Sequence, residues 1–224
     1  MGTPLWQDPA YLKGMPCDWT INESTPSDLL EPAMQADNDH SEAYLKQSHV
    51  EFTVLYAGVG LPTPPDGKII ATSTMLLLPQ SRGTVTLSSN KISDAPLVDP
   101  HYYSSEVDRV NLIHGTRRIM KAMLETKALG PHIMAEISPP GLRALRTSST
   151  DAEIDARIRN VGLAHKHAGG SNPMGKVVAP NLTVYGVKGL RVADASVLPV
   201  PVGGHPRATL YALAKQAADM ILKG

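Results

Sequence analysis

The chain has 224 residues, which is ample for a hydrophobic core and corresponds to one or two domains. Hydrophobic residues make up 42% of the chain, a share that excludes intrinsic disorder as its general state. Lysine and arginine together number 21, as do aspartate and glutamate, so no net charge attracts the chain to nucleic acid, which is not an expected partner.

The N-terminal part of the chain, residues 1–47, is rich in acidic residues and has no long periodic pattern. We expect an irregular segment with short helices, one of them over residues 41–47. The first six residues lack a basic region followed by an apolar stretch, so no secretory signal is expected and a cytoplasmic location is predicted. No apolar run approaches the ~20 residues of a membrane-spanning helix, so the membrane is not an expected partner either.

Three strand-like runs follow the acidic segment. Residues 49–57, 68–78 and 83–88 are rich in β-branched and apolar residues, and apolar and polar residues partly alternate along them. Proline and glycine residues at 62–67 and an Arg-Gly pair at 82–83 are turn signals between the runs. This pattern predicts an antiparallel β-sheet.

Helices are expected in the second half of the chain. Apolar residues recur at helical spacing over residues 106–129 and again from Thr150, which forms a capping-box pattern with Glu153. The last helix is predicted from about Pro206 to Leu222, with proline at the first helical position and His205 at the cap. The predicted fold class is therefore α+β, with an antiparallel sheet covered by helices.

Three of the eight histidines stand out because turn-forming residues surround them. His165 and His167 precede a glycine-rich stretch, and His205 follows a turn rich in proline and glycine. In an extended segment, both rings of a His-x-His pair lie on one side and can ligate a metal. No carboxylate or cysteine lies nearby in the sequence, so no metal site is predicted. The glycine-rich stretch instead suggests that the backbone closely approaches a ligand.

Motifs for two other chemistries are missing from the sequence. No serine lies in the Gly-x-Ser-x-Gly turn of a hydrolase nucleophile. Gly58-Val-Gly60 follows a predicted strand, but Thr63 replaces the third glycine of a dinucleotide motif, and Pro64-Pro65 prevents the helix that would bind a pyrophosphate. Few charged residues occur around the histidine motifs, so the expected substrate is a small apolar metabolite.

Three motifs in the C-terminal part resemble those of the glucose–methanol–choline (GMC) flavin oxidoreductases. Residues 167–175, HAGGSNPMG, resemble the family's His-Pro-x-Gly-Thr-x-x-Met-Gly. Residues 181–199 resemble the strand pair that ends in Val-x-Asp-Ala-Ser, and residues 205–221 resemble the closing helix. Residues 48–224 are therefore predicted to be a domain similar to the family's C-terminal substrate domain, after an irregular segment over residues 1–47.

The resemblance implies roles for individual residues. By this likeness His167 would be the catalytic base and His205 its partner, as in family members of the aryl-alcohol oxidase type. If FAD is bound, Asp194 and Ala195 would lie near the flavin. The further residues expected to bind substrate are His165, Ser171, Asn172 and Arg207.

The resemblance leaves three functions open, because the family's dinucleotide site lies in an N-terminal half that these residues do not contain. The leading hypothesis is an enzyme without cofactor, in which the histidines assist isomerisation, dehydration or cyclisation, including pericyclic closure, of a metabolite of secondary metabolism. The second is a fragment of an FAD-dependent alcohol oxidase or dehydrogenase that works with a separate FAD-binding chain. The third is a non-catalytic binding remnant.

Self-association is the other partner expectation. In the full family, the apolar residues near the Asp-Ala-Ser segment pack on the flavin domain. Without that domain they would form an exposed apolar patch, which favours a homodimer. The residues expected in this patch are Val192, Ala193, Val197 and Leu198.

Overall fold

The computed structural model describes residues 17, 19–56 and 68–223, and these fall into two compact units. Unit 1 comprises the described residues up to Leu76 together with Glu106–Leu163. Unit 2 comprises Leu77–Ser105 and the described residues from Ala164 onward. The expected turn at residues 62–67 and the Gly58-Val-Gly60 pattern lie outside the described residues.

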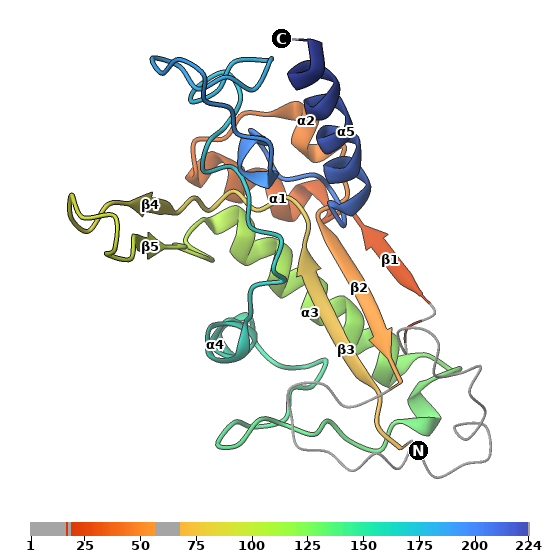
Figure 1. Ribbon diagram of the computed structural model, residues 1–224. Coiled ribbons are helices and arrows are strands. Elements are labelled where there is room, and N and C mark those ends of the chain that lie inside the picture. Colours follow the sequence, from red (N-terminus) through yellow and green to blue (C-terminus); the bar gives the residue numbers. More distant parts are fainter. Residues whose placement is uncertain (1–16, 18, 57–67, 224) are drawn as a thin grey trace. The chain divides into compact units, whose positions relative to one another are not determined.

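Both units combine short strands with helices, as the ribbon in Figure 1 shows. The strands are β1 Thr20–Glu23, β2 Val50–Leu55, β3 Ala71–Leu76, β4 Thr84–Thr86 and β5 Leu97–Asp99. The α-helices are α1 Ser27–Ala36, α2 Glu42–Leu45, α3 Glu106–Glu125, α4 Asp151–Val161 and α5 Arg207–Lys223. The 3-10 helices are η3 Gly130–His132 and η4 Ala195–Val197. The predicted α+β class is confirmed, since every ladder between these strands is antiparallel.

Unit 1 is built on a three-stranded sheet in the order β1-β2-β3, with helix α3 packed across it (Figure 1). Val50 and Phe52 of β2 form a buried cluster with Ile119 and Met123 of α3. The helix approaches the sheet closely at Gly115, where an added Cβ would lie 2.5 Å from the Cγ2 of Thr74. The predicted strands over 49–57 and 68–78 correspond to β2 and β3, but the run over 83–88 pairs as β4 with β5 in a separate sheet.

The described residues of the acidic N-terminal part are an integral portion of unit 1. Strand β1 pairs with β2, and Leu30 of α1 is fully buried. The carboxylate of Asp37 accepts hydrogen bonds from the backbone N–H groups of Glu106 and Val107, at 3.0 and 2.8 Å, and so caps the start of α3. The structure thus divides the chain differently from the expected boundary after residue 47, because this segment supplies an edge strand and a helix cap.

A buried histidine joins this N-terminal portion to the sheet. His49 is fully buried, and its Nδ1 accepts a hydrogen bond from the backbone N–H of Thr25 at 2.9 Å. Its Nε2 lies 2.9 Å from the carbonyl oxygen of Tyr44, so the pattern requires a neutral ring that carries its proton on Nε2. Burial lowers the pKa of His49 from its usual value; the nearby His114 lowers it further, against the opposing hydrogen bond to Tyr44.

We therefore expect acid to destabilise unit 1 through His49. Because its pKa is lower in the folded chain, the unfolded chain binds more protons as the pH falls through the usual value of about 6.5. The free energy of unfolding should then fall by at most about 1.4 kcal/mol per pH unit from this group. Denaturant titrations at a series of pH values from 8 to 5, spaced about half a pH unit apart, measure this slope.

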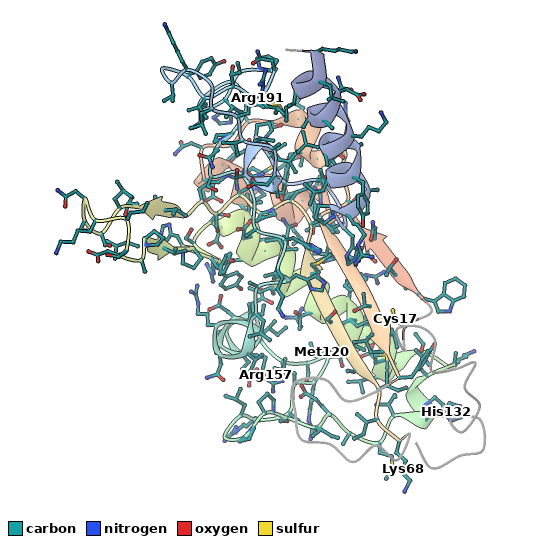
Figure 2. All side chains as sticks on the ribbon, in the orientation of Figure 1. Cys17, Lys68, Met120, His132, Arg157 and Arg191 are labelled. Atoms are coloured by element: carbon teal, nitrogen blue, oxygen red, sulfur yellow. The ribbon has the colours of Figure 1, made fainter. Side chains whose placement is uncertain are left out.

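Two variants isolate the contribution of His49. His49→Gln should lose stability at every pH but show a shallower fall toward acid than the unmodified chain. His132→Gln, which changes the exposed histidine labelled in Figure 2, should keep the full slope. An equal acid slope in His49→Gln would show that another group carries the effect.

Helix α4 begins as the sequence predicts. The hydroxyl of Thr150 accepts the backbone N–H of Glu153, and the Glu153 carboxylate accepts the backbone N–H of Thr150, so both halves of the capping box are present. On the buried face, Arg157 of α4, labelled in Figure 2, donates to the Glu136 carboxylate and to the carbonyl oxygen of Arg143, each at 2.5 Å. These contacts fasten the irregular stretch before α4 to the helix.

Unit 2 has its core beneath helix α5. Val178, Leu182, Val197 and Ala217 are buried together, and Val192 packs against them. This corrects the expected exposed patch in part: Val197 is fully buried within the unit, Val192 and Leu198 are half-buried, and Ala193 is exposed. The oligomeric state itself stays a prediction. None of the described helices is long and apolar enough to cross a membrane.

The start of α5 differs from the prediction by one residue. The helix begins at Arg207, and the backbone N–H of Leu210 donates to the carbonyl oxygen of Pro206 at 2.9 Å. Pro206 is therefore the residue before the helix and not its first helical residue, so His205 lies one residue outside the cap. Proline suits both places, because neither requires its missing N–H.

Candidate functional site

Three histidines from two separate segments of unit 2 meet in one cluster. His165 and His167 lie in the segment after α4, and His205 lies two residues before α5. The ring centroids of His165 and His167 are 5.0 Å apart, those of His167 and His205 are 5.1 Å apart, and those of His165 and His205 are 5.6 Å apart. All three side chains are exposed. The structure thus brings together the two histidines expected to be catalytic and one expected to bind substrate.

The backbone between the first two histidines is not extended, in contrast to the assumption made from the sequence. Lys166 has a φ of 60°, in the left-handed region that a residue with a Cβ adopts at a cost of about 1–2 kcal/mol. This turn at Lys166, and not the two-residue repeat of a strand, brings the rings of His165 and His167 to one cluster.

Backbone pairing fixes the glycine-rich loop that follows His167. The N–H groups of Gly170, Asn172 and Met174 donate to successive carbonyl oxygens of η4, those of Ala195, Ser196 and Val197, at 2.9–3.2 Å. A Cβ added to Gly169 would lie 2.8 Å from the carbonyl oxygen of Ala195. The loop therefore approaches the chain's own backbone closely at Ala195, and the predicted approach to a ligand stays a prediction.

The other expected site residues are placed differently from one another. The side-chain amide of Asn172 donates to the hydroxyl of Ser196 at 3.1 Å, which gives it a role in holding the loop. Ser171 and Arg207 are exposed, Ser171 in the loop and Arg207 at the first residue of α5. None of these observations tests a contact with substrate, so the substrate-binding roles stay predictions.

Asp194 and Ala195 begin the segment against which this loop pairs. The Asp194 carboxylate accepts the backbone N–H of Ser196 at 2.8 Å and caps η4. Hydrogen bonds from the hydroxyl and the backbone N–H of Ser196 lower the pKa of Asp194 from its usual value. The Asp194 carboxylate is therefore engaged within its own segment, where it fixes the start of η4.

The dinucleotide part of FAD does not fit the described residues. A site for such a group uses parallel strands, with a glycine-rich turn that leads from a strand into a helix N-terminus. Every ladder between the described strands is antiparallel, and α5, which follows Gly203-Gly204, is preceded by a turn and not by a strand. A flavin would therefore need its phosphates and adenine held by residues outside this part of the chain.

The fold and the histidine cluster define the class of protein to which the chain belongs. A family model described as GMC oxidoreductase matches residues 79–214, so the chain belongs to the GMC oxidoreductase family. The matching region is the family's C-terminal domain, as the motifs around His167 and His205 predict.

Individual relatives agree with this assignment. The chain is 37% identical over 230 residues to the GMC-type oxidoreductase acuG of Aspergillus aculeatus, covering 99% of this chain and 44% of that protein. It is 34% identical over 170 residues to versicolorin B synthase of Aspergillus parasiticus, covering 71% of this chain and 25% of that protein. The chain thus spans less than half the length of these relatives.

Solved structures share the fold. A formate oxidase from Aspergillus oryzae matches 95% of this chain with a TM-score of 0.77 and 24% identity, and the match covers 40% of that protein. A fungal aryl-alcohol oxidase matches 91% of this chain with a TM-score of 0.70 and 22% identity, and the match covers 38% of that protein. At these identities the likeness establishes the architecture alone.

The sequence identified each histidine of the cluster as a candidate site residue, but it did not predict that His165 lies beside both of the others. His165 was expected only as a substrate contact, whereas its ring centroid lies 5.0 Å from that of His167 and 5.6 Å from that of His205. The available signal was that the His-x-His pair and His205 both lie beside Pro/Gly-rich turns of one domain. That signal did not give the distance between the two segments.

Proposed function

We propose that this chain performs non-redox chemistry without flavin, in which His167 and His205 assist isomerisation, dehydration or cyclisation of a small apolar metabolite. The observation that carries the proposal is the histidine cluster, which lies wholly within unit 2 and so needs no second chain to form. Each imidazole has one nitrogen that can accept a proton and one that can donate it near neutral pH. Two of them with ring centroids 5.1 Å apart can serve two atoms of one substrate.

In this proposal His167 removes a proton from the substrate and His205 polarises or protonates a neighbouring oxygen. Removal at one atom and delivery at another moves a double bond, closes a ring on a carbonyl, or releases a hydroxyl group as water. Each outcome balances without an electron acceptor. A member of the family named as a synthase, versicolorin B synthase, is among the relatives and favours the proposal.

Activity of the chain after removal of flavin tests the proposal. The purified chain is passed through a flavin-removing step, checked for loss of visible absorbance, and incubated with uncharged hydroxy-ketones and hemiacetals. Turnover that persists at the same rate supports the proposal. Turnover that disappears and returns with added FAD would refute it.

A second function rests on the names of the other relatives. Several of the related proteins are named oxidoreductases or dehydrogenases, as acuG is. In that alternative, this chain is the substrate-binding portion of an alcohol oxidase or dehydrogenase whose FAD is held by a separate chain. It predicts that co-expression with the FAD-binding region of a relative yields a yellow complex and an electron-acceptor-dependent activity, neither of which the chain has by itself.

A further inference from the structure

We propose that His165, His167 and His205 bind one divalent ion of the zinc class. The three side chains offer ligand nitrogens that all lie within 4.8 Å of one another. Three histidines around one ion leave a fourth position open for water or another ligand. The sequence alone predicted no metal here, because no carboxylate or cysteine lies near the His-x-His pair. The third histidine, His205, is 38 residues beyond the pair, and only the fold brings it close.

Modest rotations of the side chains would complete the coordination. Bonds of about 2.0–2.1 Å to a tetrahedral ion place neighbouring nitrogens about 3.3 Å apart. The cluster must therefore contract by at most about 1.5 Å. Exposed side chains can rotate by this amount without displacing a packed core, and all three histidines are exposed. The loop after His167 is already held by its pairing with η4, so its backbone does not have to become ordered when the ion binds.

The ligand set selects the kind of ion. Neutral imidazole suits zinc, copper, nickel and cobalt, whereas magnesium and calcium require oxygen ligands. Lys166 and Arg207, which adjoin the histidines in the sequence, carry positive charges that oppose any cation. Both residues are exposed, so solvent and salt screen this repulsion, and the bond to imidazole nitrogen must outweigh it. This favours ions with strong nitrogen bonds over hard ions.

This inference does not rest on the proposed function. It concerns binding in the absence of substrate, and it holds whether or not the histidines move protons. If the histidines both bind zinc and transfer protons, the two events cannot occur at the same time, because the same nitrogen lone pair cannot hold an ion and accept a proton. Saturating zinc should then inhibit the proposed reaction.

Calorimetric titration with zinc chloride tests the site directly. The chain is used without a polyhistidine tag and after treatment with a chelator, so that the cluster is the binding site under test. We expect one zinc ion per chain and weakening of binding by at least about tenfold in His165→Ala, His167→Ala and His205→Ala each. Replacement by cobalt should give visible absorption bands typical of a four- or five-coordinate ion with nitrogen ligands.

Matched controls separate the cluster from other histidines. His132→Ala changes an exposed histidine of unit 1 and should leave the zinc affinity unchanged. Far-ultraviolet circular dichroism of every variant establishes that the fold is kept. The proposal is overturned if about 1 mM zinc does not saturate the chain, or if binding survives all three substitutions in the cluster.

Discussion

His167→Ala is expected to lower the turnover of the proposed reaction by about a hundredfold to ten-thousandfold, the usual contribution of a positioned acid–base group. His205→Ala should have an effect of the same order. Because His167 is exposed and the loop after it is held by backbone pairing with η4, neither its removal nor that of His205 should unfold unit 2. The loss should therefore appear in kcat, with circular dichroism unchanged.

The two single variants and the double variant together distinguish a joint role from separate ones. If the two imidazoles act on one substrate as a unit, the double variant should be scarcely slower than either single variant. His132→Ala, outside unit 2, should retain full turnover. Activity within about twofold of the unmodified chain in both single variants would mean that the cluster is not the catalytic site.

Leu182→Ala is expected to destabilise unit 2 by about 2–5 kcal/mol. Leu182 is 2% exposed and contacts a core that includes Val178, Val197 and Ala217. Truncation removes apolar contacts and leaves a cavity that rigid neighbours fill only in part. Since Val197 belongs to η4 and Ala217 to α5, this core also supports the segments beside the histidine cluster.

Leu190→Ala is the matched control, because Leu190 belongs to the same unit and is 49% exposed. It should change the free energy of unfolding by less than about 0.5–1 kcal/mol. Denaturant unfolding followed by circular dichroism measures both variants. Equal effects of the two substitutions would contradict the assignment of the unit 2 core.

The parts of the fold that the sequence predicted are those in which a local pattern matches the final environment. Strands β2 and β3 carry apolar residues because they pair with each other and pack against α3. The Thr150 capping box involves two side chains three residues apart, so it can be recognised without tertiary structure. The start of α5 was found to within one residue for the same reason.

The parts that were missed depend on distant partners or contain misleading residues. Strand β1 has mostly exposed side chains, so no pattern of buried residues marks it in the sequence. It is defined by its pairing with β2. Helix α1 follows Pro26 and contains Pro32, which predict a break, yet burial of Leu30 stabilises the helix. The cap of α3 comes from Asp37, about 70 residues earlier, which no local pattern can indicate.

The same limit applies to the site. The residue types of His165, His167 and His205 and their turns were visible in the sequence, and family resemblance supplied two of the roles. Their meeting depends on the turn at Lys166 and on the pairing of the loop with η4. Neither feature has a sequence signal, since lysine seldom adopts a left-handed conformation and the paired carbonyl groups are backbone atoms.

The elemental composition of the product tests the central claim most directly. High-resolution mass spectrometry of a substrate converted by the flavin-free chain separates the candidate reactions in one experiment. Non-redox histidine chemistry predicts a product with the substrate's own formula, or with that formula less one water. A product that has lost two hydrogens, formed only when an electron acceptor is present, would contradict the account.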